Sequence, residues 1–214
     1  PKSTIQVVSL NNKGISMIGL GTAAIGRPQY INIRENSNVK TFNKLEFSKE
    51  GKAMLTQAYQ KGVRHFDTAP GYGMAEQILL EWIEEFQPND VKISTKWGYT
   101  YVADFDPYAI VHEVKEHSLS KLNQQWETSK KFLPYLNIYQ IHSATLDSGV
   151  LENEAVLNRL YELKNTYKIN IGLSTSGEYQ NEIIEKASIK FKDNPNVFFK
   201  NCHVSEFTEE SSFD

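Results

Sequence analysis

The chain has 214 residues, of which 40% are hydrophobic and 23% charged, a composition typical of a soluble protein with one apolar core. A formal net charge of −3 provides no basic surface that would attract nucleic acid or an anionic membrane, and no apolar run approaches the about 20 residues that span a bilayer. The single cysteine, Cys202, excludes an intrachain disulfide, and the first residues do not resemble a secretory signal, so we expect a cytoplasmic protein.

Segments typical of strands and of helices alternate along the chain. Before Met17, an Asn-Asn-Lys-Gly turn between two extended pieces predicts a β-hairpin, and residues 17–21 predict the next strand. Residues 23–47 are polar and rich in asparagine, which indicates a long loop. A helix is then predicted from Ser48, a suitable N-cap, to Gly62, a suitable residue for the position after a helix.

The alternation continues beyond this helix. Apolar runs predict strands at residues 63–66, 91–96, 136–142, 169–174 and from 197 onwards. Helical spacing predicts helices at residues 74–86, 156–163 and 183–191, and the pair Asp106-Pro107 predicts the start of a long helix with aspartate as its N-cap. Repeated strand-then-helix units indicate an α/β fold with about six parallel strands and the helices outside them.

Polar residues stand at the carboxyl ends of four successive predicted strands. They are Asp67, Lys96, His142 and Ser174, and Tyr72 lies in the loop that leaves the first of these strands. In a (β/α)8 barrel such strand ends point to one face, where active sites are built. Neighbouring strands lie about 4.8 Å apart, so the Asp67 carboxylate and the Lys96 ammonium are expected to form an ion pair. The glycines beside Tyr72 give its loop a backbone that bends easily toward the same place.

Five sequence blocks, in order, resemble the aldo-keto reductases: GLGT at 19–22, GVRHFDTAPGYG at 62–73, STKWG at 94–98, YQIHS at 139–143 and IGLSTSG at 171–177. The block GRPQYIN at 26–32 resembles a branch of that family with a long first loop. The resemblance implies a (β/α)8 barrel of the TIM type, formed by residues 1–214 as one domain. Because only about six strands are visible, we expect the C-terminal units of the barrel to be absent or truncated.

The resemblance also implies the site residues and the cofactor. The catalytic tetrad would be Asp67, Tyr72, Lys96 and His142, and the cofactor would be NADPH, with NADH possible, lying across the barrel mouth. The residues expected to contact the cofactor are Gly21, Thr22, Asp67, Ser143, Ser174 and Thr175. At the last two positions the family commonly has a serine and an asparagine that hold the nicotinamide carboxamide, and a threonine lacks the forked donor and acceptor of an amide.

The tetrad suits carbonyl reduction. Hydride addition to a carbonyl leaves an alkoxide, so a group must donate a proton to that oxygen. Tyr72 would donate it, because a nearby ammonium, that of Lys96, favours the phenolate that remains. Asp67 would hold the ammonium, and His142 would orient the substrate oxygen or assist the transfer. The expected activity is an NADP-dependent oxidoreductase that reduces a small aldehyde or ketone.

Two other functions are compatible with the sequence. A fold of this kind also serves non-catalytic nucleotide-binding regulatory or scaffold subunits. A metal-dependent barrel hydrolase is less expected, because the first strand end lacks a His-x-His or carboxylate cluster, and no metal site is predicted. His112 and His117, five residues apart on the predicted helix, are interpreted as solvated. Tyr99 and Tyr101 either line the substrate entrance or are exposed loop tyrosines.

Overall fold

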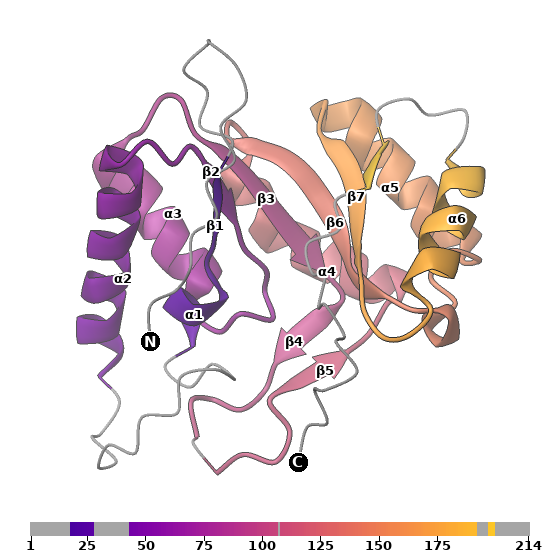
Figure 1. Ribbon diagram of the computed structural model, residues 1–214, viewed down its shortest axis with the longest axis horizontal. Coiled ribbons are helices and arrows are strands. Elements are labelled where there is room, and N and C mark those ends of the chain that lie inside the picture. The colour runs from indigo at the N-terminus through magenta and orange to yellow at the C-terminus, as the bar shows by residue number, and fades with distance from the viewer. Residues whose placement is uncertain (1–17, 28–42, 107, 192–196, 200–214) are drawn as a thin grey trace.

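The computed structural model describes residues 18–27, 43–106, 108–191 and 197–199 (Figure 1). A parallel β-sheet with helices packed against it forms the centre of this part of the chain. The hairpin predicted before Met17 and the single cysteine, Cys202, lie outside the described residues.

The sheet has six strands, in the order β1-β2-β3-β6-β7-β8, and every neighbouring pair is parallel. They are β1 (Gly19–Gly21), β2 (His65–Asp67), β3 (Lys92–Trp97), β6 (Leu136–Ala144), β7 (Asn170–Thr175) and β8 (Val197–Phe199). The six parallel strands confirm the predicted α/β architecture. Because the strands are parallel, their carboxyl ends meet at a single edge of the sheet.

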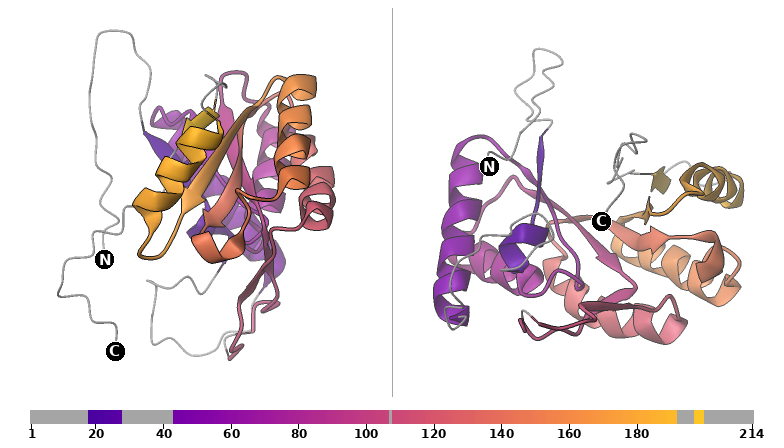
Figure 2. Two further views of the ribbon diagram at one scale, coloured as in Figure 1. Left: turned by 90° about the vertical axis from the view of Figure 1, so that its right-hand side faces the viewer. Right: turned by 60° about the horizontal axis from the view of Figure 1, so that its bottom comes forward.

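The main helices run along the outer side of the curved sheet, as the right-hand view of Figure 2 shows. They are α2 (Lys44–Gln60), α3 (Ala75–Phe86), α4 (Leu119–Ser129), α5 (Glu154–Tyr167) and α6 (Gln180–Lys190). The shorter elements are α1 (Ala23–Gly26), the 3₁₀ helices η1 (Lys130–Phe132) and η2 (Leu146–Ser148), and a separate hairpin of β4 (Tyr99–Tyr101) and β5 (Glu113–Lys115). Among the described residues, no helix combines the length and apolar character that crossing a membrane requires.

Helix α3 illustrates how the sequence pattern produces the core. Ile78, Leu79, Trp82 and Ile83 recur at helical spacing and are buried as one stripe. The Trp82 ring lies against Phe66 of β2, with 5.3 Å between ring centroids. Burying such a side chain contributes roughly 1.5–3 kcal/mol. This stripe fixes α3 on the sheet, and with it the loop that precedes α3.

Helix α2 begins four residues earlier than its predicted start at Ser48. The Oδ1 atom of Asn43 accepts hydrogen bonds from the backbone N–H groups of Leu45 and Glu46, at 3.0 and 3.3 Å, so asparagine is the N-cap. Ser48 lies inside the helix, where its hydroxyl donates to Oε2 of Glu81 at 2.8 Å. Both residue types are good caps, and the contact with Glu81 on α3 is not visible in the local sequence.

The long helix predicted from Asp106-Pro107 is wrong. In its place the chain forms the antiparallel hairpin β4–β5 and then α4, whose N-cap is Ser118. The Oδ1 atom of Asp106 accepts from the N–H of Tyr108 at 2.9 Å, which closes a turn. Aspartate before proline starts turns as well as helices, since its side chain satisfies a backbone donor in both. The hairpin follows β3 directly and therefore lies at the carboxyl edge of the sheet (Figure 1).

Candidate active site

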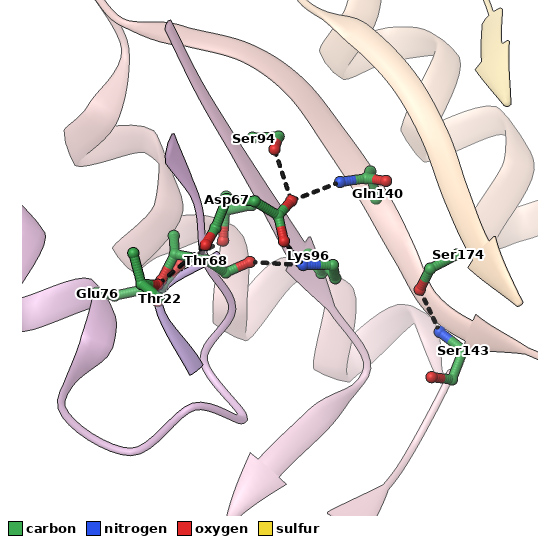
Figure 3. Close-up of polar contacts among 10 residues, drawn as sticks. Thr22, Asp67, Thr68, Glu76, Ser94, Lys96, Gln140, Ser143 and Ser174 are labelled. Carbon is green, nitrogen blue, oxygen red and sulfur yellow. Dashed lines mark hydrogen bonds and ion pairs between the residues drawn. The ribbon is translucent and has the colours of Figure 1, made fainter. Parts of the chain in front are cut away.

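An ion pair between Asp67 at the end of β2 and Lys96 on β3 forms the centre of the site (Figure 3). The other carboxylate oxygen of Asp67 accepts hydrogen bonds from Oγ of Ser94, at 2.6 Å, and from Nε2 of Gln140, at 3.3 Å. The Lys96 ammonium also donates to the backbone carbonyl of Thr68 at 3.1 Å. Strands β2, β3 and β6 thus hold the two charges together.

The Lys96 side chain has almost no contact with solvent. The residue is 1% exposed, and an ammonium this deeply buried requires a counter-charge and hydrogen-bond acceptors to be stable. Asp67 and the Thr68 carbonyl supply both. The ammonium therefore has a fixed position and remains paired within the sheet.

The loop that carries Tyr72 is fixed against α1 by direct backbone contact. A Cβ added to Gly26 would lie 1.8 Å from the backbone oxygen of Tyr72, and one added to Gly73 would lie 2.5 Å from the oxygen of Gly26. The N–H of Met74 donates to the Gly26 oxygen at 3.0 Å. Gly73 also has a φ of 62°, a left-handed value that favours glycine. The glycines therefore allow close packing, where the sequence had indicated an easily bending loop.

Tyr72 lies beside two of the other three members of the predicted tetrad, Lys96 and His142. The Lys96 Nζ atom lies 4.9 Å from the centre of the Tyr72 ring. The His142 ring lies perpendicular to the Tyr72 ring, with 5.5 Å between centroids, and His142 is 8% exposed. Asp67, Tyr72, Lys96 and His142 thus converge at the carboxyl edge of the sheet.

A second cation borders the tyrosine. Arg27, directly after α1, is buried and forms an ion pair with Glu113 of β5. Its guanidinium carbon lies 5.0 Å from the centre of the Tyr101 ring and 5.9 Å from that of Tyr72. The pair joins α1 to the hairpin β4–β5 across the Tyr72 loop. Tyr101 therefore packs inside the site and is not an exposed loop residue.

Strand β6 carries an irregularity where it meets the site. Its register with β7 shifts between Ile141 and Ala144, and Ser143 has a φ of 49°. The peptide that joins His142 to Ser143 is bonded to two side chains. Its N–H donates to Oγ of Ser174 at 2.8 Å, as Figure 3 shows, and its carbonyl accepts from Nε2 of His117 at 2.9 Å. The bulge therefore depends on residues from β7 and from the segment after β5.

His117 is a site residue that the sequence interpretation placed in solvent on a helix, and that interpretation is wrong. It lies between β5 and α4, half-buried, and packs edge-on against Trp97 with 5.4 Å between ring centroids. Burial lowers the pKa of His117 to about 4, with a further lowering from the Lys115 charge, while the hydrogen bond to the His142 carbonyl acts in the opposite direction. The imidazole is therefore neutral at physiological pH.

Tyr99 closes the same side of the site. Its ring lies 4.7 Å from that of His142, centroid to centroid. Burial raises the pKa of the Tyr99 hydroxyl, and a hydrogen bond with the Ser143 side chain partly offsets this. Tyr99 is half-buried, so the placement supports the entrance-lining alternative over an exposed loop tyrosine.

The remaining residues expected to contact a cofactor occupy different surroundings. A Cβ added to Gly21 would meet no atom of the described residues within 4 Å, so this part of the chain leaves space open beside the end of β1. The hydroxyl of Thr22 donates to the Asp67 carbonyl at 3.0 Å, and the hydroxyl of Thr175 donates to Oε1 of Gln180 at 2.9 Å. Ser174 accepts the Ser143 N–H, which leaves its own hydroxyl proton for another partner.

The model of the aldo/keto reductase family matches residues 17–205. The chain belongs to the aldo/keto reductase family. Its members are oxidoreductases with a (β/α)8 barrel, which confirms the predicted family and fold class; the described residues form part of such a barrel, with an open six-stranded sheet. Comparison with curated proteins finds no matching sequence.

Solved aldo-keto reductases share the fold at low sequence identity. A protein of Pseudomonas aeruginosa described as an aldo-keto reductase is 22% identical, with a TM-score of 0.55 over 82% of this chain and 69% of its own. The glycerol dehydrogenase of Gluconobacter oxydans is 21% identical, with a TM-score of 0.57 over 85% and 51%. An aldo-keto reductase of Bacillus halodurans, in a holo form, is 17% identical, with a TM-score of 0.56 over 86% and 51%.

One ionisable group of this aldo-keto reductase lies just behind the site, on the helix side of the sheet. Glu76, at the start of α3, is 6% exposed and accepts a hydrogen bond from Oγ1 of Thr95 at 2.6 Å. Burial raises the pKa of Glu76 to about 7, and the hydrogen bond from Thr95 and the Lys96 charge limit the rise. Glu76 thereby joins the helix after the Tyr72 loop to the strand that carries Lys96.

Two further residues of the central network carried a signal that the sequence interpretation missed. Ser94 and Gln140 precede Lys96 and His142 by two positions on their strands. Residues two apart on a strand share a face, so polar residues at these positions predict inward-facing side chains. Within the described residues, no cluster of histidine, cysteine, aspartate and glutamate has the arrangement that a metal ion requires.

Proposed function

We propose that this protein reduces an aldehyde or ketone to an alcohol with a reduced nicotinamide dinucleotide, in the first instance NADPH. The proposal rests on the convergence of Tyr72 with the buried Asp67–Lys96 pair and with His142. A phenol beside a fixed ammonium is suited to donating a proton to an oxygen on which negative charge develops.

The residues at the strand ends fit the nicotinamide part of such a cofactor. The hydroxyl of Ser174 has a proton to donate to a carboxamide oxygen, because its oxygen already accepts the Ser143 N–H. The open space beside Gly21 admits a flat ring at the end of β1. The holo form of the Bacillus halodurans relative also supports a bound cofactor. When bound, the reduced nicotinamide supplies the hydride.

The side chains of this chain would handle the proton. Tyr72 donates its phenolic proton to the substrate oxygen as the carbonyl is reduced. The Lys96 ammonium, 4.9 Å from the ring centre, stabilises the negative charge left on the phenol oxygen, and Asp67 keeps the ammonium in place. His142, perpendicular to the tyrosine ring, orients the substrate oxygen toward the phenol.

The test is the substitution Tyr72→Phe, which removes only the hydroxyl. We expect kcat for NADPH-dependent reduction of a panel of small aldehydes to fall on the order of hundredfold or more, the usual contribution of general acid catalysis. NADPH affinity, measured by isothermal titration, should stay within about twofold, because the hydroxyl acts on the substrate oxygen. Tyr167→Phe, at the end of α5, serves as the matched control.

NADPH binding and aldehyde turnover by the parent protein distinguish an enzyme from a nucleotide-binding protein. NADPH binding without turnover of any aldehyde in the panel would contradict the proposal and favour a non-catalytic nucleotide-binding subunit. Equal turnover by the parent and by Tyr72→Phe would remove Tyr72 as the proton donor while leaving the reductase activity in place.

A further inference from the structure

A single peptide group at the carboxyl edge of the sheet is hydrogen-bonded to side chains through both its N–H and its carbonyl. It joins His142 to Ser143 in the bulge of β6, where the ladder to β7 is interrupted. Its N–H donates to Ser174, and its carbonyl accepts from His117. A peptide outside the ladder requires other hydrogen-bond partners, and the direction of the His142 side chain follows from the orientation of this peptide.

The surroundings of His117 fit that contact closely. The ring lies against Gly98, where an added Cβ would be 2.3 Å from Cδ2 of His117, and Gly98 has a φ of 108°. The N–H of Glu116, the residue before His117, donates to the Gly98 carbonyl at 2.8 Å. The ring also packs edge-on against Trp97. The His117 imidazole therefore packs closely against the backbone that follows β3, which leaves the ring little freedom to rotate.

We propose that His117 is a positioning residue that holds the His142–Ser143 peptide, and through it aims the His142 imidazole at the substrate oxygen. The inference rests on the proposed reductase function for its catalytic consequence but not for its structural one. Because a carbonyl only accepts, Nε2 of His117 must carry a proton, and in the neutral imidazole Nδ1 then carries none. Burial, which lowers the pKa of His117 to about 4, keeps this neutral form over the working pH range.

The test compares two substitutions at the same position. His117→Gln retains an N–H donor that reaches the carbonyl, whereas His117→Phe fills the space without one. We expect His117→Phe to lower kcat and kcat/KM for aldehyde reduction in parallel, by about tenfold to hundredfold, as misplacement of a catalytic group does. His117→Gln should recover activity to within about threefold of the parent. His112→Gln changes a histidine near β5 that is not part of the network and is the matched control.

A second readout does not depend on activity. In the parent, nitrogen NMR should show His117 as the Nε2–H tautomer from pH 6 to 8, without titration in that range. Amide hydrogen exchange at Ser143 should become at least about tenfold faster in His117→Phe and stay close to parental in His117→Gln. If the parent lacks reductase activity, these measurements still test the peptide contact, so the two proposals fail separately.

Three outcomes would overturn the positioning role of His117. A neutral His117 imidazole in the parent with its proton on Nδ1, and none on Nε2, would refute the hydrogen bond to the carbonyl. Activity and Ser143 exchange that are unchanged in His117→Phe would refute the positioning role. Loss of activity in both variants with identical Ser143 exchange would show that His117 acts in some other way.

Discussion

At the scale of single residues, the buried ammonium of Lys96 is stable only while a carboxylate lies beside it, so removal of that carboxylate should destabilise the folded protein. Asp67→Asn keeps the shape of the partner but removes its charge. We expect the free energy of unfolding to fall by about 3–5 kcal/mol, the usual cost of leaving a buried charge without its partner. Chemical denaturation of the parent and the variant measures the difference.

The control for this substitution is an exposed pair. Lys52 and Glu85 form an ion pair at 2.5 Å, with side chains 23% and 63% exposed. Glu85→Gln should change the free energy of unfolding by less than about 1 kcal/mol. Equal effects of the two substitutions would mean that water reaches the Asp67–Lys96 pair.

Glu76 predicts how the stability of the protein depends on pH. Its pKa is about 7 in the folded protein against an ordinary 4.5, so the folded state binds a proton more tightly than the unfolded state. The corresponding stability is fully present below pH 4.5 and is lost as the pH rises through 7, by about 3 kcal/mol. We expect Glu76→Gln to remove this loss, since the amide oxygen still accepts the Thr95 hydroxyl and carries no charge.

The measurement is urea unfolding of the parent and of Glu76→Gln at several pH values from 4.5 to 8. The difference in unfolding free energy should grow in favour of the variant with rising pH. Glu84→Gln, at an exposed position on the same helix, should follow the parent curve. A parallel course for all three proteins would show that folding does not raise the pKa of Glu76.

The tetrad positions could be predicted from the sequence because each lies at the end of, or just after, an apolar strand. The partners of these residues were harder to find. The two-residue period of a strand could have predicted that Ser94 and Gln140 face the site. The hydrogen bond between His117 and the His142 carbonyl, however, joins residues 25 positions apart. No local pattern encodes such a contact, and the same histidine reads equally well as a solvated side chain.

At the scale of elements, the contact between α1 and the Tyr72 loop is the tightest in the site. Gly26→Ala would place a methyl group 1.8 Å from the Tyr72 oxygen, so the loop must move. We expect a loss of at least about 1–3 kcal/mol in unfolding free energy, typical of overpacking, and a lower kcat. In Gly19→Ala the added Cβ would lie 3.5 Å from the nearest atom, so this control should behave like the parent in both assays.

The contrast between the two alanine variants separates packing from backbone entropy. Both replace a glycine by alanine, and so both reduce the freedom of the unfolded chain by a similar amount. If Gly26→Ala were as stable and active as Gly19→Ala, α1 and the Tyr72 loop would have to be farther apart than described.

The order of strands and helices was predictable because each buried element repeats its apolar residues with its own period. The predictions failed where capping signals carried the argument alone. Asp106-Pro107 resembles a helix start, yet β5, which ends at Lys115, pairs with β4 across the turn. That pairing, together with the Arg27–Glu113 ion pair, fixes the hairpin over the site and depends on residues far apart in sequence.

At the scale of the whole molecule, the proposed tetrad comes from a small part of the fold. Asp67, Lys96 and His142 come from β2, β3 and β6, which are neighbours in the sheet, and Tyr72 follows β2. The relatives from Gluconobacter oxydans and Bacillus halodurans are about twice as long as the part that this chain covers. The four residues proposed to handle the proton therefore all lie within the described part of the chain.

The seclusion of Lys96 has a consequence for its chemical reactivity. Acylating reagents modify only amines that they can reach, and this one is 1% exposed and bonded to Asp67 and the Thr68 carbonyl. In a native-state labelling experiment read by peptide mass, Lys44, with a side chain 58% exposed, should react at once. Lys96 should react only during rare openings of the sheet. Equally fast labelling of both lysines would contradict the buried pair. A slower rate at Lys96 would instead measure how often the strands around Asp67 and Lys96 open.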